Sequence, residues 1–111
     1  MSIFAAVTTG KGTGAISTVQ IFGDSAEAVI KKVFKPAGTK PSKFKTGDIL
    51  LGTITDGAEV IDQVTIGCEG PDTFAINCHG NPLIVEIIMQ LLQQHGANLV
   101  TAEQLLSLIH I

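Results

Sequence analysis

The first apolar segments of the chain predict a pair of strands. Ile3–Val7 is a short apolar run, and Ala15–Phe22 is rich in β-branched side chains, which favour extended backbone. Between them lies Gly10-Lys11-Gly12-Thr13-Gly14, whose glycines adopt positive φ without strain. The pattern therefore predicts two strands joined by a glycine-rich turn.

A helix is expected after the second strand. Asp24 or Ser25 can cap its first turn. Apolar residues then recur at helical spacing, namely Ala26, Val29, Ile30, Val33 and Phe34. Pro36 ends the helix because it cannot continue the backbone hydrogen bonding, and residues 36–46 are expected to form a loop.

Three more strands form a predicted antiparallel meander. Asp48–Thr55 and Glu59–Cys68 are joined by Asp56-Gly57, a dipeptide that favours tight hairpin turns. A second turn follows, and Thr73–Cys78 predicts the last strand of the meander.

The second helix has the strongest signals at both ends. Asn81 can cap it, Pro82 suits its first position, and Gly96 suits the left-handed residue beyond its end. Its apolar residues cover nearly the whole circumference: Leu83, Ile84, Val85, Ile87, Ile88, Met89, Leu91 and Leu92. Such a helix is expected to be covered on two sides, and a second subunit could supply one of the covers.

A third helix is predicted behind a brief extended piece at Leu99-Val100. Thr101 and Gln104 have the spacing of a capping box. Apolar residues continue to Ile111, so we expect the chain to be a piece of a longer protein. Residues 1–111 are predicted to form one α+β domain, with two to three helices packed on a small, mostly antiparallel sheet.

Composition restricts the class of protein. The 111 residues are 45% hydrophobic and 15% charged, with a mean hydropathy of +0.41, which suggests burial against a partner. No apolar run reaches the roughly 18 residues of a membrane helix. The N-terminus lacks the basic and apolar regions of a signal peptide. We therefore expect a cytoplasmic protein without a membrane partner.

The charges argue against direct nucleic-acid binding. The net charge is −3, and the seven lysines are accompanied by no arginine, whereas a nucleic-acid site needs a basic face. Cys68 and Cys78 are predicted to be reduced thiols, because segments paired as a tight hairpin would not place them opposite each other.

Motifs for catalysis or metal binding are weak. The glycine-rich segment lacks the spacing of a phosphate-binding loop. Cys78-His79 stands before the second helix, but the sequence indicates no acid to orient His79, so a buried thiol and a turn histidine are favoured over a nucleophilic pair. With Cys68 and His95 these residues lack recognised ligand spacing, and no metal is expected.

The order of several short motifs resembles the N-terminal domain of tRNA-modification GTPases of the TrmE (MnmE) family. Gly12-Thr13-Gly14-Ala15-Ile16 through Gly23 keeps the length and hydrophobic pattern of the family's Pro-Gly-Arg-Gly-Gly and the strand that follows it. Gly52-Thr53-Ile54-Thr55-Asp56 and Val60-Ile61-Asp62-Gln63-Val64 follow the family's Gly-x-Ile-Asp and Val-Ile-Asp-Glu-Val segments. Cys78-His79-Gly80 matches Cys-His-Gly-Gly, and Gly96-Ala97-Asn98-Leu99 follows Gly-Ala-Arg-Leu.

This resemblance implies an α+β domain that forms a homodimer and binds 5-formyltetrahydrofolate, a one-carbon tetrahydrofolate derivative, at the dimer interface. In the family the folate serves modification of the tRNA wobble uridine, alongside helical and GTPase domains. Neither domain is predicted within residues 1–111, so no catalytic residue and no GTP hydrolysis are assigned to this chain. Its partners are expected to be a second copy and the remainder of a TrmE-like protein.

Departures from the family pattern affect the expected folate site. The family's two arginines fall on Thr13 and Gln20, an acidic loop before Cys78 is missing, and Glu103 is what remains of a Pro-Gly-Glu-Phe-Thr motif. By position, the folate-binding candidates are Lys11, Thr13, Gln20, Cys78, His79 and Glu103.

Three functions follow from these residues. The first is a dimerisation domain with a degenerate folate site. The alternative is a functional folate-binding module in which Lys11 and Glu103 replace the lost groups. The third is an enzyme that uses Cys78 and His79.

Overall fold

The chain begins with two antiparallel strands. The computed structural model describes residues 2–8, 15–38 and 44–110. Strand β1 (Ile3–Val7) pairs with β2 (Ile16–Gly23). The glycine-rich segment that contains Lys11 and Thr13 lies outside the described residues.

Helix α1 is shorter than the sequence predicts. It spans Ala26–Val33, and Ser25 occupies the cap position without a side-chain capping hydrogen bond. Phe34 was expected to belong to the helix, but it begins strand β3 (Phe34–Pro36), which pairs with β4 (Ile49–Asp56). The helical periodicity extends to Phe34 because a residue directly after a helix can still face the same core.

The predicted meander is present. Strands β4 (Ile49–Asp56), β5 (Glu59–Gly70) and β6 (Thr73–His79) are antiparallel neighbours. Gly57 has φ of 61°, which is the left-handed conformation that the hairpin dipeptide predicts. Strand β5 ends two residues later and β6 one residue later than the pattern indicates, whereas β4 has the predicted length and is shifted by one residue.

The C-terminal elements follow the sequence signals closely. Helix α2 spans Pro82–Gln94, with the Asn81 side chain accepting from the Leu83 N–H at 2.8 Å, and Gly96 has φ of 104°. The brief extended piece expected at Leu99-Val100 is instead strand β7 (Ala97–Leu99). It leads to α3 (Ala102–Ile109), which has the predicted capping box. None of the helices within residues 2–8, 15–38 and 44–110 is long and apolar enough to cross a membrane.

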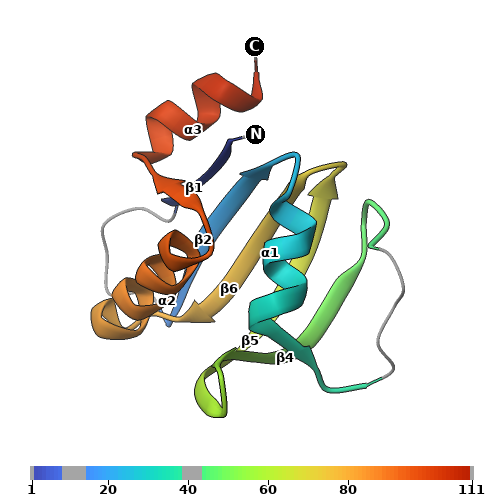
Figure 1. Cartoon of the computed structure of the whole chain (residues 1–111), viewed down its shortest axis with the longest axis vertical. Helices are drawn as coiled ribbons and strands as arrows, with labels where there is room; N and C mark the ends of the chain where they lie inside the picture. The colour runs from blue at the N-terminus through green and yellow to red at the C-terminus, as the bar shows by residue number, and fades with distance from the viewer. Residues whose placement is uncertain (1, 9–14, 39–43, 111) are drawn as a thin grey trace.

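The strands form one sheet in the order β3-β4-β5-β6-β2-β1-β7. All neighbours are antiparallel except β1 and β7, which are parallel. In Figure 1, α1 and α2 lie against the sheet, while α3 extends from the β1–β7 side. This α+β architecture confirms the predicted fold class.

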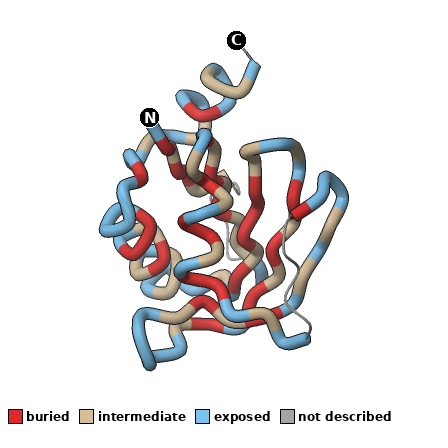
Figure 2. The backbone as a smooth tube through the Cα atoms, turned by 45° about the vertical axis from the view of Figure 1, so that its right-hand side comes forward, coloured by how far each residue is buried: buried red, intermediate tan, exposed pale blue. Residues whose placement is uncertain are grey.

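The core lies between the sheet and helices α1 and α2. Alternate strand residues face it, as the alternation of buried and more exposed positions in Figure 2 shows. Ile76 of β6 is fully buried, which contributes about 1.5–3 kcal/mol for a side chain of this size. Phe44, within the expected loop, is also buried and packs edge-on against Phe74 with ring centroids 5.2 Å apart.

The opposite side of the sheet carries the remaining strand residues, and we call it the outer face. Alternation assigns to it polar and apolar side chains from four strands: Ile16, Thr18, Gln20, Ile49, Leu51, Gln63, Thr65 and Asn77. The apolar residues of this set, Ile16, Ile49 and Leu51, are all strongly exposed. The outer face therefore differs from the core face in being partly polar and open.

Candidate functional site

The predicted site residues that the structure describes come from three elements. Cys78 and His79 end β6, Gln20 lies in β2, and Glu103 lies in the first turn of α3. His79 is opposite Ile16 in the β2–β6 register, four residues along β2 from Gln20. At about 3.3 Å per residue this separation is roughly 13 Å.

Gln20 and Glu103 are thus separate from the Cys78-His79 pair. The amide of Gln20 donates to the carboxylate of Glu69 on β5. Glu103 is exposed on α3, a helix that packs on β1. Only Cys78 and His79 among the described candidates lie side by side.

Cys78 is buried, as predicted. It is 3% exposed, and its Sγ lies 3.6 Å from the backbone oxygen of Ser17. Burial, together with the nearby Asp62 carboxylate, raises the pKa of the Cys78 thiol to about 11. A nucleophilic cysteine needs a lowered pKa, so this environment opposes covalent catalysis.

His79 does have an acid partner, and the expectation that it lacks one was wrong. Asp62 of β5 accepts the backbone N–H of His79 with Oδ2 at 2.8 Å, and its Oδ1 lies 2.7 Å from Nδ1 of the ring. Asp62 is 9% exposed, whereas the His79 side chain is 67% exposed. One buried carboxylate therefore fixes both the backbone and the ring of an exposed histidine.

The position of Asp62 in β5 is itself a signal of a buried carboxylate. Asp62 lies an even number of positions from Val64, Ile66 and Cys68, which all face the core, so its side chain lies on the same side of the strand. A carboxylate at a core-facing position needs a hydrogen-bonding partner because burying it unpaired is costly. That signal indicates that Asp62 has a partner, but it does not identify His79.

The junction between β6 and α2 is held by backbone and side-chain hydrogen bonds. The Gly80 N–H donates to the Ala15 oxygen at 2.9 Å, and Asn81 caps α2. These contacts, with the two to Asp62, place the His79 ring at the end of the sheet.

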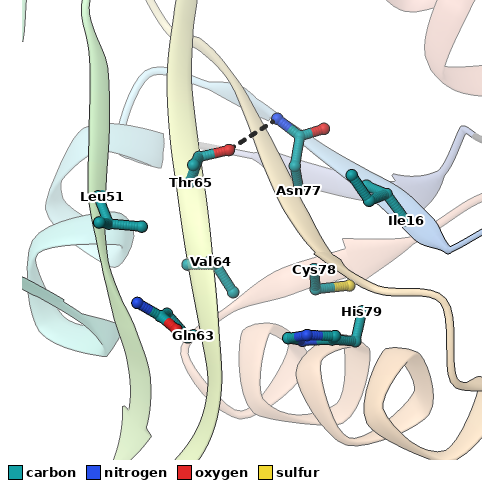
Figure 3. A pocket seen from close by; sticks show the side chains of 8 residues that line it. All are labelled: Ile16, Leu51, Gln63, Val64, Thr65, Asn77, Cys78 and His79. Carbon is teal, nitrogen blue, oxygen red and sulfur yellow. Dashed lines mark hydrogen bonds between the residues drawn. The ribbon is translucent and has the colours of Figure 1, made fainter.

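A hollow of about 300 Å³ lies beside this ring (Figure 3). Its lining comes from β2, β4, β5 and β6: Ile16, Leu51, Gln63, Val64, Thr65, Asn77, Cys78 and His79. The Thr18 hydroxyl donates to Asn77 Oδ1 at 2.8 Å, and Asn77 Nδ2 donates to the Thr65 hydroxyl at 3.3 Å. Figure 3 shows the second of these bonds at the upper side of the hollow.

The groups that line this hollow are neutral, apart from the titratable Cys78 and His79. A pterin is recognised by a carboxylate and a glutamate tail by cations. The described lining supplies neither an exposed carboxylate nor a lysine. The hollow is suited to hydrogen bonding with an uncharged group rather than to ion pairing.

Comparison with known proteins identifies the family. The model of the family described as "GTP-binding protein TrmE N-terminus" matches residues 3–104. A tRNA modification GTPase MnmE from Flavobacterium psychrophilum is 35% identical over 87% of this chain and 23% of that protein. The protein of the same name from Enterococcus faecalis is 38% identical over 86% of this chain and 22% of that protein.

A solved structure shares the fold. A heterotetrameric sarcosine oxidase from Corynebacterium, in complex with pyrrole 2-carboxylate, matches 78% of this chain and 42% of its own with a TM-score of 0.53. At 19% identity this similarity concerns the fold alone. The chain spans less than a quarter of the length of the MnmE relatives described above. The family match covers most of the described strands and helices, and the chain belongs to the TrmE N-terminal domain family.

Proposed function

We propose that this chain is the dimerisation domain of a tRNA-modification GTPase and that its folate site is degenerate. The MnmE relatives are named as tRNA modification GTPases, and the family covers residues 3–104. GTP hydrolysis and tRNA modification are assigned in this proposal to the remainder of a longer protein. A direct role in nucleic-acid binding is not proposed, because the net charge is −3 and arginine is absent.

The apolar surface of α2 is the observation that carries the proposal. Ile88, Leu91 and Leu92 are buried within the chain. Leu83 is 62% exposed, and Ile87, one turn later on the same side, is half-buried. The chain thus covers one side of this helix and leaves apolar surface on another, where a second copy of α2 could pack.

Sedimentation of matched variants tests this interface. We expect the wild-type chain to be a dimer at tens of micromolar and the Leu83→Lys variant to dissociate, because an unpaired buried charge costs about 3–5 kcal/mol. Such a cost corresponds to a dissociation constant raised by at least about a hundredfold. Leu106→Lys is the control, since Leu106 is 58% exposed on α3 and outside the proposed interface.

Two results would contradict the proposal. One is a monomeric wild-type chain at tens of micromolar, and the other is equal dissociation of the Leu83 and Leu106 variants. Far-UV circular dichroism establishes that each variant is folded. Charges at Ile88 or Leu92 are less suitable, because both side chains are fully buried in the chain itself and their replacement would unfold it.

We also propose that 5-formyltetrahydrofolate binds weakly or not at all. Thr13 and Gln20 stand where the family has arginines, and the Gln20 amide already donates to Glu69. Each lost charge-assisted hydrogen bond costs about 1.5–3 kcal/mol, or roughly tenfold to a hundredfold in affinity. Calorimetry is therefore expected to detect no binding at micromolar ligand. A low-micromolar dissociation constant would favour the alternative, a functional folate-binding module.

A further inference from the structure

We propose that Asp62 is a positioning residue that holds His79 as the Nδ1–H tautomer, so that Nε2 accepts a hydrogen bond from an uncharged amide or lactam in the adjacent hollow. This inference is independent of dimerisation. The described lining has no carboxylate to pair with a pterin amino group and no cation to pair with a glutamate tail, so the ligand proposed is an amide or lactam without those groups.

The tautomer follows from the two contacts of the carboxylate. An ionised carboxylate only accepts hydrogen bonds. Oδ1 of Asp62 lies 2.7 Å from Nδ1 of His79, so Nδ1 must carry the proton. Oδ2 accepts the backbone N–H of the same residue at 2.8 Å, which holds the carboxylate in place.

The exposed nitrogen of the neutral ring is then an acceptor. A neutral imidazole has one protonated nitrogen, and the hydrogen bond at one nitrogen decides the role of the other. The His79 side chain is 67% exposed and forms part of the lining of the hollow. A ligand there must bring an N–H or O–H donor to Nε2.

The rest of the lining restricts the ligand further. The Thr65 hydroxyl accepts from Asn77 Nδ2, which leaves its own proton for an acceptor such as a carbonyl. Ile16 and Leu51 are 63% and 51% exposed and provide apolar walls. A small ring that carries both a carbonyl and an N–H matches this combination, whereas a carboxylate lacks the donor.

The tautomer is measured directly by long-range ¹H–¹⁵N correlation of the histidine ring at pH 8.5, where imidazole is normally neutral. We expect wild-type His79 to carry its proton on Nδ1. In Asp62→Asn the amide oxygen can keep the backbone contact while the amide N–H₂ donates to Nδ1, so the proton is expected on Nε2. A wild-type ring protonated on Nε2, or on both nitrogens, would overturn the proposal.

Ligand selectivity is tested with benzamide and benzoate, which have the same shape but differ in charge and in their donor. Amide signals of Thr65, Asn77 and His79 are followed during titration of each compound. We expect wild-type protein to favour benzamide by about tenfold, the effect of one good hydrogen bond. In Asp62→Asn the ring becomes a donor, and the preference is expected to shift toward benzoate.

The control is Glu59→Gln, which makes the same change of charge at an exposed position on the same strand. It is expected to keep the wild-type preference. A purely structural role for Asp62 would change affinity for both compounds equally and would refute the assignment. If Asp62→Asn does not fold, the tautomer and the ligand selectivity of the wild-type protein still test the proposal. Equal binding of the two compounds to the wild-type protein, or no binding of either, refutes it.

Discussion

Gly52 offers the sharpest test of how β3 packs against the sheet. It pairs with Pro36 of β3 and with Val64 of β5, so it has neighbours on both sides. A Cβ added at Gly52 would lie 2.2 Å from the Lys35 backbone oxygen and 2.6 Å from Cε1 of Phe34. Both atoms belong to the strand that the sequence did not predict.

The cost of Gly52→Ala can be estimated from this geometry. The Phe34 ring is 6% exposed and packed in the core, and moving the Lys35 oxygen disrupts the β3–β4 ladder. Overpacking costs about 1–3 kcal/mol, and a backbone obstacle favours the upper end. For a domain of this size, about 3 kcal/mol lowers the melting temperature by roughly 10–20 °C.

Gly67→Ala is the matched control. Gly67 lies on the neighbouring strand β5, and an added Cβ there meets no atom within 4 Å. We expect its stability to be unchanged or raised by about 0.5 kcal/mol, since alanine has less unfolded-state freedom than glycine.

Urea unfolding followed by far-UV circular dichroism measures the difference. Tryptophan and tyrosine are absent, so intrinsic fluorescence is of little use. Protein concentration must be held constant, because dimerisation would couple to unfolding. If Gly52→Ala and Gly67→Ala had the same free energy of unfolding within about 0.5 kcal/mol, the placement of β3 against Gly52 would be refuted.

Three further predictions concern caps, packing and thiol ionisation. Thr101→Ala should lower the free energy of unfolding by about 1 kcal/mol, because it removes the capping box. Ser25→Ala should have little effect, because Ser25 makes no side-chain cap, and chemical denaturation compares the two variants. Leu105→Ala should cost about 2–5 kcal/mol, since Leu105 is fully buried, while the exposed Leu106→Ala should cost under about 0.5 kcal/mol in the same assay. The Cys78 thiol should alkylate slowly in the native protein at mildly acidic and neutral pH, and fast labelling there would contradict its burial. Because its pKa is raised in the folded state from 9.0 to about 11, Cys78 should favour the unfolded state as pH rises above 9, which a stability–pH profile with Cys78→Ala as reference would measure.

The sequence by itself determined the elements whose signals are local. Asn81, Pro82 and Gly96 set the ends of α2, because a cap, a fixed φ and a left-handed residue act within one turn of backbone. Thr101 and Gln104 set the start of α3 for the same reason. The burial of Cys78 followed from its position in an apolar strand.

Only the tertiary structure decided the features that depend on neighbours distant in the chain. Phe34 has the periodicity of α1, yet pairing with Ile54 makes it a strand residue, because the hydrogen bonds of β4 were available to it. Asp62 and His79 are 17 residues apart in sequence, and they meet because β5 and β6 are neighbouring strands of the sheet. A local pattern indicates that a buried carboxylate needs a partner, but the register of neighbouring strands determines which residue supplies it.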